Sequence, residues 1–100
     1  MTIELGGSIT LVGFKERDPA ELVVVKKLVG AYARKITDAS SGFEGLTVSM
    51  KPVHKQGDSE KFEVHAKVLL AGKPQVSEVT DRNLFVALDS ALKKLTASLA

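Results

Sequence analysis

The sequence predicts one α+β domain, in which a four-stranded sheet carries two helices on one face in the order β-α-β-β-β-α. Four stretches alternate apolar and polar residues, which is typical of half-buried strands. Two longer stretches have apolar residues at helical spacing and begin with capping residues. The chain has 100 residues, enough for one hydrophobic core, and shows no internal repeat, low-complexity tract or charge block. We therefore expect a single domain over residues 1–100.

The N-terminal half contains the first strand and the first helix. Residues 8–12 alternate β-branched and apolar side chains before Gly13, which predicts a strand. Asp18 is placed to accept the free amides of the first helical turn, and Pro19 suits the first helical position. Glu21 would complete a capping box. The helix is expected to run for about eighteen residues, with a core stripe of Leu22, Val25, Leu28, Val29, Tyr32 and Ile36.

Three more strands are predicted after this helix. Residues 46–51 and 62–68 alternate cleanly between apolar and polar side chains. A tight connection at residues 71–73 leads to a last strand at residues 75–79. The alternation slips in this last strand, which indicates a bulge or a strand at the edge of the sheet.

A second amphipathic helix closes the chain. Either Asp81 or Asn83 is expected to cap it, because each has a short side chain that can accept backbone N–H groups. Its buried stripe is predicted to be Leu84, Phe85, Leu88, Ala91, Leu92, Leu95 and Leu99.

The alternation in the strands predicts two different sheet faces. The face toward the helices would carry apolar residues: Ile9, Leu11, Leu46, Val48, Met50, Phe62, Val64, Ala66 and Val68. The other face would be polar, slightly basic and open to water, with Ser8, Thr10, Thr47, Ser49, Lys51, Glu63, His65 and Lys67.

Composition excludes several classes of protein. The chain has no cysteine, so it has no disulfide, thiolate metal site or cysteine nucleophile. We find neither an apolar run long enough to span a membrane nor an export signal, and we expect a cytoplasmic protein without membrane contact. The net charge of +2 and the pI near 9.0 indicate a mild preference for polyanions.

The sequence offers little support for catalysis or for a metal site. His54 borders a polar loop and His65 alternates with charged residues on the open sheet face, so we expect both to be solvated surface residues. Neither histidine has a partner at a metal-ligand spacing. The glycines match neither the dinucleotide nor the phosphate-loop motif. We therefore expect no enzyme, no catalytic residue, no metal and no small-molecule cofactor.

The basic residues allow two interpretations. They either make a soluble surface of dispersed lysines, or they line a groove between helix faces that binds phosphates by releasing counterions. In the second interpretation the candidate RNA-binding residues are Lys26, Lys27, Arg34, Lys35, Lys51, Lys67, Arg82, Lys93 and Lys94. An RNA reader that stacks bases on its sheet is disfavoured, because polar residues and no aromatics fill the middle of the open face.

Three features of the sequence match the pattern of a known family. They are the helix motif Asn83, Leu84, Phe85, Ala87, Leu88, Asp89, Lys94 and Leu95, the opening strand with Gly13, and Lys26-Lys27-Leu28 on the first helix. In these features the chain resembles the family of ribosome hibernation-promoting factors and ribosome-associated translation inhibitors, whose domain has the same order of elements. The resemblance is strongest from residue 61 to residue 95 and covers nearly the whole chain.

The resemblance implies binding to ribosomal RNA of the small subunit, in the channel used by messenger and transfer RNA. Translation would be inhibited and idle ribosomes protected, as in a stress response, with Lys27 and Lys94 as the best-matched contacts. Asp89 would orient a neighbouring lysine. The protein would be a monomer or a weak homodimer. Two alternatives stay open, a generic binder of structured RNA and a protein–protein interaction module of the same topology.

Overall fold

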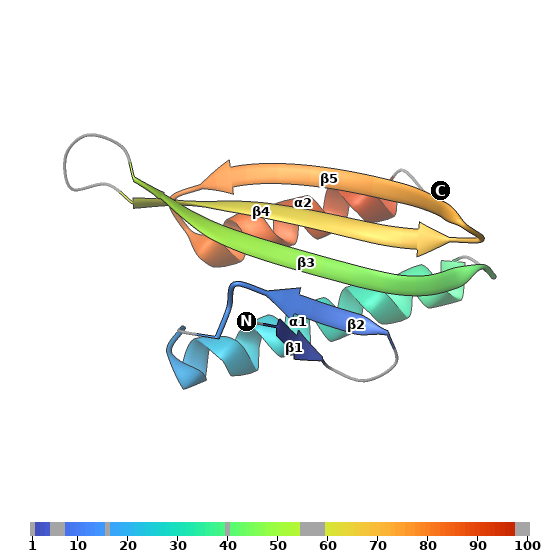
Figure 1. Ribbon diagram of the computed structural model, residues 1–100, viewed down its shortest axis with the longest axis horizontal. Helices are drawn as coiled ribbons and strands as arrows, with labels where there is room; N and C mark the ends of the chain where they lie inside the picture. The colour runs from blue at the N-terminus through green and yellow to red at the C-terminus, as the bar shows by residue number, and fades with distance from the viewer. Residues whose placement is uncertain (1, 5–7, 16, 40, 55–59, 98–100) are drawn as a thin grey trace.

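The computed structural model contains all the predicted elements, preceded by one short additional strand (Figure 1). The structure describes residues 2–4, 8–15, 17–39, 41–54 and 60–97. The elements are β1 (Thr2–Glu4), β2 (Ile9–Val12), α1 (Pro19–Ala39), β3 (Phe43–His54), β4 (Glu60–Leu70), β5 (Lys73–Asp81) and α2 (Leu84–Ala97). The predicted α+β class and the order of the main elements are confirmed.

The strands form one sheet in the order β1-β2-β3-β4-β5. Strand β2 pairs in parallel with β3, and α1 makes the crossover between them. All other neighbours are antiparallel. The four predicted strands are present, and β1 adds a fifth strand of 3 residues at the edge beside β2. A segment this short carries too little alternation to be recognised in a sequence.

Both helices pack on one face of the sheet, as predicted, and the core lies between the two layers (Figure 1). The predicted helix-facing strand residues are buried or half-buried, and so are the predicted stripe residues that the structure describes. Leu99 lies outside the described residues. Phe14, which the sequence analysis did not place in the core, is completely buried. Phe14 follows Gly13, which has a φ of +85°. Glycine is required at this position because a Cβ would overlap the carbonyl oxygen of Met50.

At the start of α1 the predicted cap is present, but the predicted capping box is not. The Asp18 carboxylate accepts a hydrogen bond of 2.8 Å from the amide of Ala20, which confirms Asp18 as the cap. The predicted capping box is not how Glu21 is used. Its carboxylate instead accepts bonds of 2.9 and 3.2 Å from Arg17, whose guanidinium also lies 5.0 Å from the ring centre of Phe62. Glu21 thus fixes the loop before the helix.

The start of α2 resolves the choice between the two predicted caps. Asn83 Oδ1 accepts hydrogen bonds from the amides of Phe85 (2.9 Å) and Val86 (3.2 Å), so Asn83 is the cap. Asp81 accepts a bond of 2.9 Å from the Asn83 amide and so supports the turn that leads into the helix.

Strand β5 is an edge strand, and it pairs with β4 in one unbroken register, without the bulge that was the other interpretation. Inward and outward residues alternate regularly along it, but the inward residues Gln75 and Ser77 are polar. Ser77 faces the helices, where its hydroxyl donates a bond of 2.6 Å to the carbonyl of Ala91, while Val76 is 64% exposed on the outer side. The polar residue therefore occupies the inner position because it has a partner on α2.

Among the described residues, no helix is long and apolar enough to cross a membrane.

Candidate functional site

The outward side of α1 carries a shallow hollow bordered by basic side chains. Lys27, Gly30, Ala31, Arg34, Lys35 and Asp38 line it. These positions share the side of the helix turned away from the core residues Val25 and Val29. Gly30 forms the floor, because apart from its chain neighbours and the backbone of α1 no heavy atom lies within 4 Å of the place where its Cβ would be. A ligand can therefore approach the helix backbone closely between Lys27 and Arg34.

The seam between the two helices is held by a tyrosine. The Tyr32 hydroxyl donates a hydrogen bond of 2.7 Å to Asp89 Oδ1 on α2, and the Lys35 ammonium lies 5.1 Å from the centre of the Tyr32 ring. Burial, then the hydrogen bond to Asp89 and its negative charge, raise the pKa of Tyr32 to about 12. Asp89 was expected to orient a lysine, but its hydrogen bond is to the tyrosine.

The remaining helix-side cations lie on or just before α2. Lys93 is one helical turn after Asp89 and so lies on the outward side near the seam. Lys94 is placed further round α2, on the side turned away from Asp89. Both lysines are exposed in the last turns of the helix, where positive charge also favours the helix dipole. Arg82 is exposed in the connection between β5 and α2.

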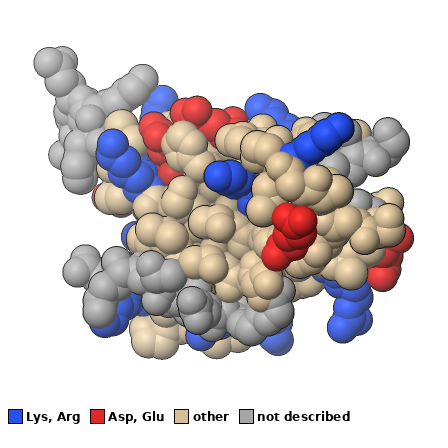
Figure 2. Space-filling model, turned by 45° about the vertical axis from the view of Figure 1, so that its right-hand side comes forward, with Lys and Arg blue, Asp and Glu red and all other residues tan. Residues whose placement is uncertain are grey.

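The open face of the sheet carries the other two predicted cations, in a different electrostatic setting. Lys51 on β3 is the cross-strand partner of Glu63 on β4, and Lys67 lies next to His65 along the same face of β4. These four residues line a shallow hollow together with Thr47, Ser49, Met50 and Val76. Positive and negative side chains are therefore mixed on this face. In Figure 2, basic (blue) and acidic (red) side chains are likewise interspersed on the face in view.

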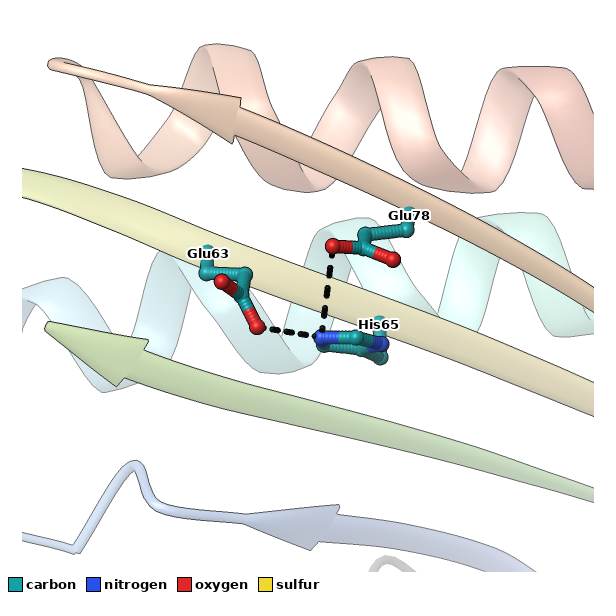
Figure 3. Close-up of side chains that lie close together, drawn as sticks. All are labelled: Glu63, His65 and Glu78. Carbon is teal, nitrogen blue, oxygen red and sulfur yellow. Dashed lines mark hydrogen bonds and ion pairs between the residues drawn. The ribbon is translucent and has the colours of Figure 1, made fainter. Parts of the chain in front are cut away.

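Glu63 and His65, which line this hollow, form a cluster of three ionisable side chains with Glu78 on the neighbouring strand β5. His65 Nε2 lies 2.6 Å from Glu63 Oε1 and 3.9 Å from Glu78 Oε1 (Figure 3). The pKa of Glu63 is lowered, first by its hydrogen bond with His65 and further by the charges of His65 and Lys51, although partial burial opposes the shift. The side chain of His65 is 40% exposed, which fits the expectation of a surface residue on the open face. It differs from an isolated surface histidine because two carboxylates lie beside it.

The sequence analysis missed this cluster because it looked for ligands at helical spacings. The feature of the sequence that could have revealed the cluster was the predicted hairpin between the last two strands. His65 and Glu78 lie at equal distances from the two-residue turn Ala71-Gly72, so pairing across that turn places them side by side. Glu63 lies two residues from His65 and therefore on the same face.

The structure thus divides the predicted RNA-binding residues between two surfaces. One surface is made by the helices and the connection before α2: Lys26, Lys27, Arg34, Lys35, Arg82, Lys93 and Lys94. We call it the helix surface. The other is the open sheet face, with Lys51 and Lys67. The two surfaces lie on opposite sides of the sheet, with the core residues between the sheet and the helices.

No protein-family model matches the chain, and no relative is found among curated proteins. Solved structures do match. A ribosomal subunit interface protein from Coxiella burnetii is 16% identical, with a TM-score of 0.60 over 92% of this chain and 90% of that one. The N-terminal domain of Protein Y from Thermus thermophilus is 20% identical, with a TM-score of 0.60 over 93% and 92%. The predicted resemblance is confirmed at the level of fold, and the chain has the fold of these two proteins.

Proposed function

We propose that the protein is a small cytoplasmic factor that binds the small ribosomal subunit through ribosomal RNA. In this proposal it occupies the channel of messenger and transfer RNA, inhibits translation and protects idle ribosomes, and it acts by binding rather than by catalysis. The observation that carries the proposal is the fold shared over at least nine-tenths of both chains with a protein described as a ribosomal subunit interface protein.

The helix surface supplies the chemistry for this binding. Lys27 and Arg34 lie seven residues apart and border the hollow floored by Gly30, so two phosphates could be contacted along one side of α1. Lys35 continues this surface to the seam, since it covers the ring of Tyr32. Lys93 lies across the seam on α2. Each phosphate contact would release counterions, which favours binding to RNA at low salt.

The open sheet face is less suited to RNA. Thr47, Ser49, His65 and Lys67 occupy its middle, so it offers no aromatic platform among the described residues on which unpaired bases could stack. Its two lysines are offset by Glu63 and Glu78. We therefore assign the contact with RNA to the helix surface, and the mode of recognition to shape and phosphate rather than base stacking.

The test is co-sedimentation of the full chain with purified small ribosomal subunits at low and moderate salt, with and without transfer RNA. We expect saturable binding that weakens with salt and is displaced by transfer RNA. The double reversal Lys27→Glu with Lys94→Glu should weaken it by at least about tenfold, because it replaces attraction to phosphate by repulsion on both helices.

A second double reversal provides the matched control. Lys51→Glu with Lys67→Glu changes the net charge by the same amount, but on the open sheet face. This variant is expected to bind nearly as well as the parent. Equal losses in the two variants would mean that binding follows net charge and that the helix surface is not the contact. Absence of binding by the parent chain at low salt would contradict the proposed function itself.

A protein–protein interaction module is the second candidate function, and the edge strand β5 favours it. The strand has a regular register with β4 on one side only, and Val76 on it is the most exposed of the large hydrophobic residues among those described. Association through this edge would depend little on salt. Sedimentation of the protein alone across a salt series separates it from RNA binding.

A further inference from the structure

Three side chains with metal-binding atoms stand together on the open sheet face, far from the helix surface. Glu63 and His65 are two residues apart on β4, so both point to the same side of the sheet. Glu78 is the direct cross-strand partner of His65 on β5. The pairing of two long strands therefore fixes the three positions.

The side chains converge on a single nitrogen atom. Figure 3 shows both carboxylates directed toward the same ring nitrogen of His65, with Glu63 Oε1 at 2.6 Å and Glu78 Oε1 at 3.9 Å. One N–H group can make one good hydrogen bond at this nitrogen, and it is directed to Glu63. The Glu78 oxygen lies too far away to share it. A positive ion in place of the proton would contact all three groups at once.

The spacing of these atoms suits a small divalent ion. All three candidate ligand atoms lie within 4.8 Å of one another. An ion bound at about 2.0–2.2 Å from nitrogen and oxygen ligands needs donors closer together than that limit, within reach of small side-chain rotations. The side chains of Glu63, His65 and Glu78 are 28%, 40% and 57% exposed, so an ion can enter without any change in the fold.

We propose that Glu63, His65 and Glu78 form a binding site for one divalent transition-metal ion of the zinc class. Zinc-class ions take both imidazole nitrogen and carboxylate oxygen as ligands, whereas magnesium and calcium take oxygen ligands. The three side chains are partly exposed, so water would take the remaining coordination positions. The site goes beyond the proposed binding to RNA and does not depend on it.

Lys51 is the charged group that most directly opposes an ion at this site. It is the cross-strand partner of Glu63 on β3, and its positive charge acts on that carboxylate. Lys67 lies next to His65 on the other side. If the site binds a cation, removing the charge of Lys51 must strengthen binding, whereas a change of a ligand must weaken it. Opposite effects of neighbouring substitutions are a signature that general loss of structure would not produce.

Zinc ion alone is titrated into the untagged chain at neutral pH, and binding is measured by calorimetry and by NMR of the histidine rings. We expect saturable binding of one equivalent, with the ring signals of His65 shifted. His65→Gln should abolish the binding, Glu78→Gln should weaken it by about tenfold, and Lys51→Gln should tighten it by about threefold. His54→Gln, which removes the other of the 2 histidines, is the matched control and should bind as the parent does.

Two results would overturn the proposal. One is the absence of saturable binding by the parent chain up to millimolar zinc. The other is binding that survives His65→Gln or is lost in His54→Gln, because the ion would then be bound elsewhere. Backbone amide spectra of each variant verify that the fold is kept. Since no ribosome takes part, failure here leaves the proposed function untouched, and failure of ribosome binding leaves the metal site untouched.

Discussion

At the scale of single residues, the contact between Tyr32 and Asp89 is the most informative. It joins the two helices by one hydrogen bond of 2.7 Å, between residues 57 positions apart in the sequence. Tyr32 could be placed toward the interior from the helical period, because it belongs to the predicted core stripe, whereas Asp89 was expected to orient a lysine. Their pairing could not be predicted, since it depends on how the two helices are rotated against each other.

This contact leads to a prediction at alkaline pH. The pKa of Tyr32 is raised from 10.0 to about 12. The contribution of the protonated Tyr32 to the free energy of unfolding is therefore complete below pH 10 and is lost as the pH rises toward 12. The chain has 1 tyrosine and no tryptophan, so the ultraviolet absorbance of the phenolate reports on Tyr32 alone. The titration midpoint of the folded protein should lie near 12, and Asp89→Asn should lower it toward 10.0.

Tyr32→Phe serves as the control for this titration. It removes the absorbance change and, in unfolding experiments, the part of the alkaline loss of stability that belongs to this side chain. A midpoint near 10.0 in the folded parent protein would show that neither burial nor the hydrogen bond to Asp89 raises the pKa of Tyr32.

At the scale of elements, capping residues were the easiest feature to predict and interior polar residues the hardest. Asp18 could be recognised, and Asn83 was one of two candidates, because a short polar side chain before an apolar helical stripe has one common use. Ser77 could not. Its inward position on β5 contradicts the usual alternation and becomes understandable only through its hydrogen bond to the Ala91 carbonyl.

The cap of α2 can be tested directly. Asn83→Ala removes the acceptor for the amides of Phe85 and Val86, and we expect it to lower the free energy of unfolding by about 1 kcal/mol. Asn83→Asp keeps an oxygen acceptor at the same position and should retain most of the stability. Urea denaturation of the three proteins measures the difference. An unchanged midpoint for Asn83→Ala would mean that the two hydrogen bonds contribute nothing to the stability of the folded protein.

At the scale of the whole molecule, the sequence determined the layers and left the grouping of charges open. Alternation and helical stripes were enough to predict most of the residues that lie between the sheet and the helices, although Phe14 and Ser77 were missed. The spacing of lysines along the chain could not show that Lys27 and Lys51 lie on opposite sides of the sheet. The Glu63, His65 and Glu78 cluster needed one further step, the register of the β4–β5 hairpin, which its two-residue turn already encodes.

Lysines on the helix surface and on the open sheet face should differ in how much they contribute to the salt dependence of RNA binding. Replacing one lysine that contacts a phosphate lowers the slope of log affinity against log salt by about one. We expect this change for Lys27→Gln and no change for Lys67→Gln on the open sheet face. Binding to small ribosomal subunits at four or more salt concentrations gives both slopes. Equal slopes in the two variants would place the contact elsewhere than on the hollow of α1.

The parallel pairing of β2 with β3 also has a consequence for the order in which the molecule assembles. Strands β3, β4 and β5 are joined by successive hairpins, and α2 follows directly and packs on β4 and β5. These contacts close short loops, so they can form early. Strand β2 reaches β3 only after α1 has folded back across the sheet. The C-terminal part of the chain can therefore fold through contacts between neighbouring elements, whereas β2 and α1 must dock onto the sheet that β3, β4 and β5 have already formed.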